Sequence, residues 1–345
     1  MLQHARFSIA SVALGVSLVL APPSHAQTQY TVVELAGLPG SASDHASGVN
    51  DRGEVIGLSG PHAPDAVAWT RDGLVELGGL LASEPDSVPR SINKRGDIVG
   101  DSLFSNSVWP FQRHGFLWRD GAMTDLGTLP GKAETYAVAI NDRGEIAGTA
   151  YTIGFGSNLV LWSDGAIHDL GAVRASSAWV TDMNNRRQIV GYAGGATSRP
   201  FLWQDGVLTY LPSLTDSGSS FPLSINDRGE IAGSSEAPDG TRHAVLWRDG
   251  AIVDLGLLPG SFNTVATSIN ERGQVVGFAL DLLNPGIHNR AFLWEDGRMI
   301  ELAPMPGRAW AIASAINDHG EIVGFQADAV NYGDRAIMWI PKKGR

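Results

Sequence analysis

The sequence predicts an all-β fold, a seven-bladed β-propeller of four-stranded antiparallel blades, from a sevenfold repeat, its hairpin signals and matching chain ends. In each repeat an apolar residue precedes Asn, and a Gly-containing turn, a short apolar run and a Trp follow. The Asn residues recur every 42 to 48 residues, a period typical of propeller blades and solenoid repeats. The Asn anchors are Asn50, Asn93, Asn141, Asn184, Asn226, Asn270 and Asn317. The associated Trp residues are Trp69, Trp118, Trp162, Trp203, Trp247, Trp294 and Trp339.

The third repeat illustrates the predicted blade. Asn141–Gly144 favours a tight turn, because Asn bonds its own backbone two residues on and Gly adopts positive φ without strain. Asp164-Gly165 is a strong hairpin signal between two apolar runs. Four short strands in one repeat are typical of a propeller blade. The four expected strands are Tyr136–Ile140, Glu145–Gly148, Leu159–Trp162 and Ala166–Gly171.

The two ends of the chain distinguish a closed propeller from an open solenoid. The last repeat stops at Trp339–Pro341 without a fourth strand, whereas Thr31–Gly40 resembles the fourth-strand segment Met123–Gly131. We therefore expect the N-terminal strand to complete the seventh blade and close the ring, which removes the exposed edges of a linear stack. A solenoid would instead need two capping repeats.

Composition and motifs exclude several function classes. The formal net charge is −11 and no basic stripe is present, which argues against nucleic-acid binding. The chain has no Cys, so it must depend on a packed core rather than on disulfides. No metal-ligand spacing of His, phosphate-binding loop or nucleophile elbow stands in a suitable context, so we expect no metal and no cofactor.

Residues 1–26 are expected to be a secretory signal peptide. Phe7–Ala21 is a 15-residue apolar stretch, and Ser24-His25-Ala26 is a small-x-small cleavage site. The alternative, a membrane anchor, would need about 20 apolar residues. Residues 27–345 would then form one propeller domain, a monomer in the periplasm or outside the cell, with no membrane insertion after the signal is removed.

The repeated sequence resembles the HAF-repeat family of bacterial extracellular repeat proteins. The resemblance lies in His114–Gly121, His243–Gly250 and Ile225–Gly233, and it covers nearly all of residues 27–345. It implies export and a propeller-like fold. It implies no settled activity and no catalytic motif, so no catalytic residue is assigned.

The repeated Asn and Trp residues are interpreted as structural. A Trp at the end of each third strand suits packing between blades, where truncation costs about 3–5 kcal/mol. Asn with the following Asp could ligate calcium, but that ion needs six to eight oxygens, and an Arg follows in most repeats. One repeat places Arg187 where the others have Gly, which predicts either a strained positive φ or a different turn.

The residues that do not repeat are the candidates for binding. Connections after strands two and four vary, and alternation places them on one face of the propeller, where binding normally occurs. Aromatic or His residues lead into several first strands and could line the channel mouth or pack between blades. The candidate ligand-binding residues are His45, Trp109, Tyr136, Trp179, His288 and Trp310.

Three functions remain open from the sequence. The first is an exported, non-enzymatic module that binds a glycan, peptide or protein on the variable face. The second is a propeller lyase or hydrolase of an extracellular polymer, with a His or Tyr acid/base at the channel mouth. The third is a structural surface component. The lack of a clustered titratable set favours the first and third.

Overall fold

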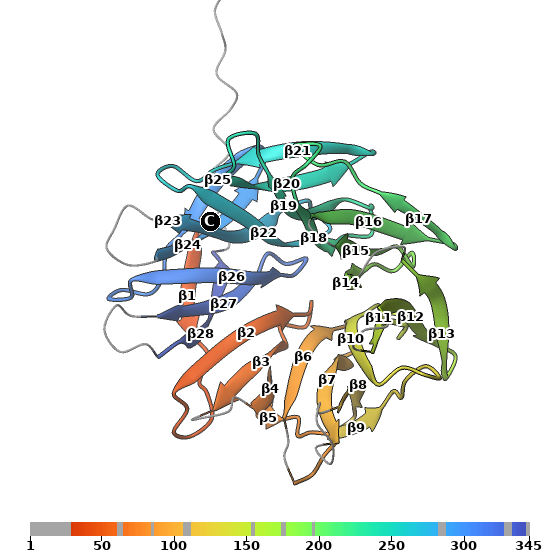
Figure 1. Cartoon of the computed structure of the whole chain (residues 1–345). Coiled ribbons are helices and arrows are strands. Elements are labelled where there is room, and N and C mark those ends of the chain that lie inside the picture. The colour runs from red at the N-terminus through yellow and green to blue at the C-terminus, as the bar shows by residue number, and fades with distance from the viewer. Residues whose placement is uncertain are drawn as a thin grey trace, which may run out of the picture.

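The computed structural model describes residues 29–60, 65–83, 86–105, 112–152, 156–173, 177–194, 197–281, 288–327 and 333–342. These ranges contain strands, turns and no helix, and therefore no helix able to cross a membrane. The strands form seven antiparallel blades around a central channel (Figure 1). The predicted seven-bladed β-propeller is confirmed.

The first strand of each blade lies nearest the channel, and the fourth lies outermost (Figure 1). Blades 1 to 3 comprise β2 (Ser43–Val49), β3 (Val55–Gly60), β4 (Asp65–Thr70), β5 (Gly73–Glu76); β6 (Ser87–Ile92), β7 (Ile98–Ser105), β8 (Gln112–Arg119), β9 (Ala122–Asp125); and β10 (Glu134–Ile140), β11 (Ile146–Tyr151), β12 (Ser157–Ser163), β13 (Ala166–Ala172). Blades 4 and 5 comprise β14 (Ser177–Met183), β15 (Ile189–Gly194), β16 (Ser198–Gln204), β17 (Val207–Tyr210); and β18 (Ser220–Ile225), β19 (Ile231–Glu236), β20 (Arg242–Arg248), β21 (Ala251–Gly256). Blades 6 and 7 comprise β22 (Asn263–Ile269), β23 (Val275–Asp281), β24 (His288–Glu295), β25 (Arg298–Leu302); and β26 (Trp310–Ile316), β27 (Ile322–Ala327), β28 (Arg335–Pro341), β1 (Tyr30–Glu34).

Two tight turns shape each blade. In the third blade, Asp164 and Gly165 have φ values of 53° and 77°, the left-handed pair that a type I′ hairpin requires. In the other turn, the N–H of Gly144 donates to the carbonyl of Asn141 at 3.0 Å. Because strands alternate in direction, both turns lie on one face of the disc, which we call the turn face. The other connections lie on the opposite, variable face.

The core lies between adjacent blades. The second strand of the third blade needs Gly where it pairs with the first strand, because a Cβ at Gly148 would lie 2.1 Å from the carbonyl oxygen of Tyr136. Trp162 and Trp339 are buried, and each indole N–H donates to a carbonyl of the preceding blade, of Leu126 at 2.9 Å and of Ala303 at 2.8 Å. Trp69 and Trp247 make the same bond, and Trp118, Trp203 and Trp294 pack partly buried against the inter-blade cores. The predicted packing role of the repeated Trp is thus observed, with a hydrogen bond added in four blades.

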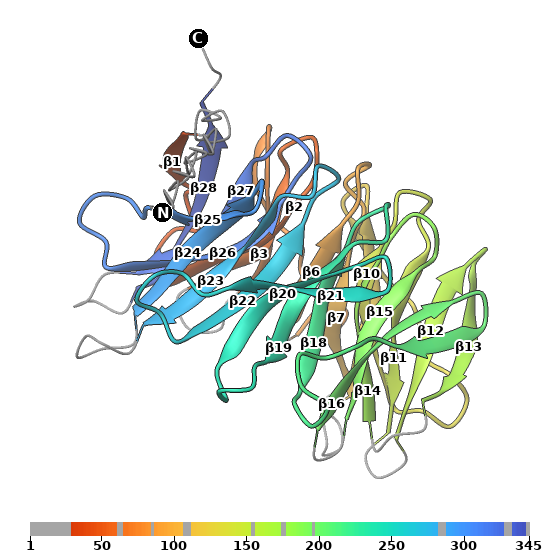
Figure 2. The same ribbon diagram turned by 90° about the horizontal axis from the view of Figure 1, so that it is seen from above.

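The N-terminal strand closes the ring. β1 pairs antiparallel with β28 from Tyr30 opposite Pro341 to Glu34 opposite Ile337, and the two strands lie side by side in Figure 2. The carbonyl of Ala36, just beyond β1, accepts from the Trp69 indole of blade 1 at 2.7 Å. The N-terminal segment therefore joins the last blade to the first.

Deleting residues 29–36 should open the propeller. The change removes the half-buried side chains of β1 and exposes the edge of β28, so we expect the free energy of unfolding to fall by about 3 kcal/mol or more. Thermal denaturation compares the variant with a chain that begins at Gln29. Equal melting temperatures would show that β1 does not hold the ring closed.

Candidate functional site

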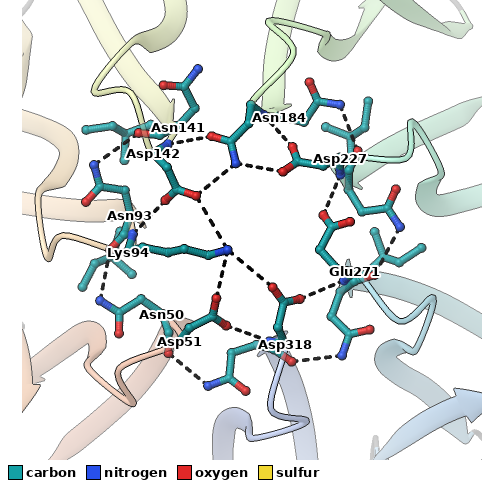
Figure 3. Close-up of a pocket in the computed structure, with 18 of the residues that line it drawn as sticks. Asn50, Asp51, Asn93, Lys94, Asn141, Asp142, Asn184, Asp227, Glu271 and Asp318 are labelled. Carbon is teal, nitrogen blue, oxygen red and sulfur yellow. Dashed lines mark hydrogen bonds and ion pairs between the residues drawn. The ribbon is translucent and has the colours of Figure 1, made fainter.

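The seven Asn anchors surround the channel at the turn face (Figure 3). Among the described residues six of the seven use the whole amide, as Asn50 shows, whereas Asn141 makes its three bonds within its own turn. Its Oδ1 accepts the backbone N–H groups of Arg52 and Glu54, both at 3.0 Å. Its Nδ2 donates to the Glu54 carboxylate at 2.6 Å and to the carbonyl of Asn93, in the next blade, at 3.0 Å. One side chain therefore folds its own turn and binds the neighbouring blade.

These amide-to-carbonyl bonds link the blades in a ring. Six such bonds join consecutive Asn anchors within the described residues. One of the six closes the ring, because Asn317 donates to the carbonyl of Asn50 at 3.0 Å. The other five run from Asn50, Asn93, Asn184, Asn226 and Asn270 to the next anchor. The sequence predicted the turn but not the ring. The available signal was that Asn occurs in every repeat, although several other residues could also form the turn.

A second ring is formed by the residue after each Asn. In six of the seven described repeats its backbone N–H donates to the side chain of the equivalent residue one blade on, as from Asp227 to Glu271 at 2.6 Å and from Asp318 to Asp51 at 2.9 Å (Figure 3). Five members are acidic. The ring consists of Asp51, Lys94, Asp142, Asn185, Asp227, Glu271 and Asp318. It lines a polar cavity of about 180 Å³ together with the Asn anchors.

Lys94 supplies the positive charge at the centre of this ring. Its Nζ lies 3.2 Å from Asp51, 3.6 Å from Asp318 and 3.8 Å from Asp142. Burial acts to lower the pKa of Lys94, but the hydrogen bond to Asp51 and the surrounding carboxylates outweigh it and raise that pKa. In the described part of the chain, no group of three or more His, Cys, Asp or Glu residues is arranged to hold a metal ion.

Asp182 lies two residues before its Asn anchor and is the one carboxylate at that position among the seven repeats. It accepts the N–H of Ile225, in the next blade, at 2.9 Å, a bond that Ser91 and Ser224 make at 3.3 and 3.4 Å in other blades. Protein surrounds the carboxylate, although the side chain keeps partial contact with solvent. Burial raises the pKa of Asp182 to about 6 despite its hydrogen bonds.

Arg187 adopts the positive φ that Gly adopts without strain in the other repeats. Its φ is 57°, and its N–H donates to the carbonyl of Asn184 at 3.2 Å, as Gly does in other repeats. The turn is therefore unchanged, and the alternative of a different turn is wrong. The guanidinium Nε donates to Glu145 at 2.6 Å, which helps to offset the strain.

On the variable face, two of the predicted residues, Tyr136 and Trp179, lie together in a group of aromatic rings that extends across blades 3 to 5. We call this group the first aromatic cluster. The Trp179 ring lies 6.0 Å from that of Tyr136 and 5.9 Å from that of Tyr151. The Tyr192 and Phe221 rings, 5.0 Å apart, continue it toward blade 5. Burial and the hydrogen-bonded Glu134 raise the pKa of Tyr136, so its hydroxyl stays protonated at neutral pH.

The other predicted residues form a second aromatic cluster across blades 7 and 1. The His45 ring lies 4.2 Å from Phe325, whose ring is 5.9 Å from Trp310. The Nε2 of His45 is 2.5 Å from Asp334. His288 begins β24, but its side chain and all of Trp109 lie outside the described residues. The structure thus divides the candidates into two clusters.

His and acidic residues also pair within blades, a feature missed from the sequence. His114 lies 3.0 Å from Asp125, and His243 lies 2.9 Å from Asp254, in each case between strands three and four. The common spacing of eleven residues was the available signal. Blade 4 replaces the pair with Arg199 above the Tyr210 ring at 3.9 Å. Because one blade replaces the His–Asp pair with an Arg–Tyr pair at the same positions, we interpret these pairs as cross-strand stabilisation rather than as catalytic groups.

Comparisons with known proteins show the fold. No family model matches the chain, and no curated protein matches it. An oligogalacturonate lyase from Vibrio parahaemolyticus superposes with a TM-score of 0.60 at 9% identity, over 91% of this chain and 94% of the lyase. The β-propeller domain of the Trilobed protease from Pyrococcus furiosus gives 0.58 at 11% identity, over 86% and 95%.

TolB from Acinetobacter baumannii is also similar, with a TM-score of 0.50 at 11% identity over 76% of this chain. The match spans 63% of TolB, less than two thirds of its length. At these identities the likeness establishes a propeller scaffold and no activity. The same scaffold serves a lyase and a protease domain among the proteins it resembles.

Replacing Lys94 with Met should destabilise the acidic ring. Loss of the ammonium group leaves Asp51, Asp142 and Asp318 without their counter-charge, and we expect the melting temperature to fall by about 2–4 °C at pH 7 and low salt. The deficit should shrink in high salt, which screens the charges of the ring. Lys94→Arg is the charge-conserving control. A Lys94→Met melting curve that matches the parent at low salt would contradict this role.

Replacing Asp182 with Asn should change the pH dependence of stability. The folded-state pKa is raised above the unfolded value, so the contribution of Asp182 is full at low pH and is lost as pH rises through about 6. The stability of Asp182→Asn relative to the parent should therefore increase by about 2 kcal/mol between pH 4 and pH 7. Urea denaturation at both pH values measures this. Asp182→Ser, which installs the residue of blades 2, 5 and 6, should behave alike; a pH-independent difference would contradict the raised pKa.

Proposed function

We propose that this protein is an exported, non-enzymatic binding protein that holds a carbohydrate chain on its variable face. The observation that carries the proposal is the first aromatic cluster, in which Tyr136, Tyr151 and Trp179 are only half-buried on first and second strands. Large aromatic rings that keep contact with solvent beside a channel are typical of binding surfaces.

The cluster suits a sugar because it combines apolar ring surface with polar edges. Sugar rings present an apolar face of C–H groups, which packs on aromatic rings, and hydroxyl groups, which need hydrogen-bond partners. The Tyr136 hydroxyl donates to Glu134 at 3.0 Å, and the Arg242 guanidinium lies 4.8 Å from the centre of the Phe221 ring. Rings held by β-strands lose little conformational entropy when a ligand binds.

The export in this proposal rests on the N-terminal signal features and on the HAF-repeat resemblance. Both fit a carbohydrate-binding role, since extracellular and cell-wall polymers are available to an exported protein. The glycan class is chosen over peptide or protein because the clustered rings are few and lie between blades, whereas a protein partner needs a broad apolar patch.

A lyase or hydrolase acting on an extracellular polymer is the second candidate, and His45 is the observation that favours it. Its Nε2 is hydrogen-bonded to Asp334, which leaves Nδ1 as the available ring nitrogen, and Trp310 belongs to the same aromatic cluster. An oriented imidazole can act as a general base. Polymer cleavage that is present in the parent and abolished in His45→Ala would establish this candidate.

Glycan binding should depend on Trp179. We expect Trp179→Ala to weaken binding at least tenfold, which corresponds to about 1.4 kcal/mol, because it removes the central ring of the cluster. A glycan array identifies binders for the parent, and isothermal titration calorimetry then compares the variants.

The matched control is Tyr210→Ala, which removes an exposed ring from the outermost strand of the same blade. Its affinity should equal that of the parent. Failure of the parent to bind any glycan, or equal affinities for the parent and Trp179→Ala, would contradict the proposed function.

A further inference from the structure

A cavity of about 210 Å³ lies between blades 6 and 7 at the variable face. Asp281, Asn289 and Arg290 line it from blade 6, and Trp310 lines it from the start of blade 7. Its volume is well above the roughly 30 Å³ that one water molecule occupies in the liquid. It adjoins the second aromatic cluster, to which Trp310 also belongs.

Comparison of the repeats shows that an inter-blade contact found in four other blades is missing here. In blades 3, 4, 5 and 7 the residue five before the repeat Trp bonds to the start of the next blade, through its side chain or its backbone N–H. Arg113 of blade 2 instead bonds within its own blade. Ser157 accepts the N–H of Ala178 at 2.6 Å, and the N–H of Arg242 donates to Asn263 at 2.5 Å. In the last blade Asp334 pairs with His45. Asn289 occupies this position in blade 6, and within the described residues its Oδ1 has no hydrogen-bond partner.

A donor beside Asn289 is also unsatisfied. The Nε of Arg290 is buried without a hydrogen bond among the described residues, 3.9 Å from the Asp281 carboxylate. That separation suits an intervening hydroxyl or water. The guanidinium is otherwise held by Glu301 at 3.1 Å and by the carbonyl of Pro259 at 2.8 Å. Buried polar groups of native proteins are normally paired, so these two indicate a polar molecule in the cavity.

We propose that this cavity binds one neutral sugar residue of a glycan. A sugar hydroxyl donates to Asn289 Oδ1, and a neighbouring hydroxyl bridges Arg290 Nε and Asp281. Trp310 provides the apolar surface for the sugar ring. The two carboxylates, Asp281 and Glu301, against one guanidinium leave the cavity with a net negative charge, which disfavours uronic acids. The inference rests on the proposed function and adds a subsite to it.

Titration with the methyl glycosides of glucose, galactose, mannose and galacturonic acid tests the subsite. The readouts are intrinsic Trp fluorescence and the Arg290 Nε–Hε signal in ¹H–¹⁵N spectra, assigned with Arg290→Lys. We expect at least one neutral glycoside to shift that signal, and galacturonate to bind at least tenfold more weakly. Asn289→Leu and Trp310→Ala should each weaken binding at least tenfold, whereas Tyr210→Ala should not.

Asn289→Leu also controls for folding, since it replaces the amide with an apolar group of similar size and should leave the melting temperature equal to or above that of the parent. A signal that no neutral glycoside moves, or a crystal soaked with them that shows only water at Asn289 and Arg290, would overturn the subsite. Glycan binding that depends on Trp179 but not on Asn289 or Trp310 would overturn the subsite alone. Glycoside binding in the cavity, combined with binding of the longer glycan that Trp179→Ala does not weaken, would instead overturn the role of the first aromatic cluster.

Discussion

The amides of six Asn anchors each join one blade to the next, and the geometry of the ring depends on them. The position requires a side-chain oxygen that accepts two backbone N–H groups. It also requires two side-chain N–H donors, one for a carboxylate or amide oxygen of the same turn and one for the carbonyl of the next blade. Asp offers no donors in its ionised form, and Ser offers one. Asn satisfies all four bonds from one buried side chain in six of the described repeats, and in the third repeat Asn141 still makes the three bonds of its own turn.

This ring also determines what gathers at the channel. Because the anchors approach one another, the residues that follow them are brought together as well, and five of those are acidic. Their carboxylates accept the N–H groups of neighbouring blades, so the negative charge is a consequence of inter-blade bonding. Lys94 lies within ion-pair distance of Asp51, Asp142 and Asp318 among the five carboxylates, so one lysine neutralises only part of the ring. Burial and the charges of Asp227 and Asp318 raise the pKa of Glu271.

Turn chemistry and periodicity were readable from the sequence because they are local. The Asp-Gly hairpins and the Asn turn follow from neighbours in the chain. The strand that completes blade 7 pairs residues far apart in the chain, and it was predictable because Thr31–Gly40 resembles the fourth strand that the last repeat lacks. The Asn ring, Lys94 among three carboxylates and the His–Asp pairs were not predicted, because each joins residues that only the closed ring or the sheet register brings together. The candidate site was predicted in part: Tyr136 and Trp179 meet, and His45 and Trp310 share a cluster, but the division into two clusters depends on which blades adjoin.

The two faces of the propeller differ in how much of their polar chemistry is already used. At the turn face, Asn amides, carboxylates and Arg side chains bond to one another from blade to blade, which leaves few groups for a ligand. At the variable face the inter-blade bonds differ from blade to blade, and between blades 6 and 7 the Oδ1 of Asn289 has no hydrogen-bond partner within the described ranges. A repeat protein gains a specific site where its repeats stop being equivalent, since equivalent positions are constrained by the shared fold. The departures at Asn289, Trp310 and the half-buried rings therefore carry more functional information than the invariant Asn and Trp residues.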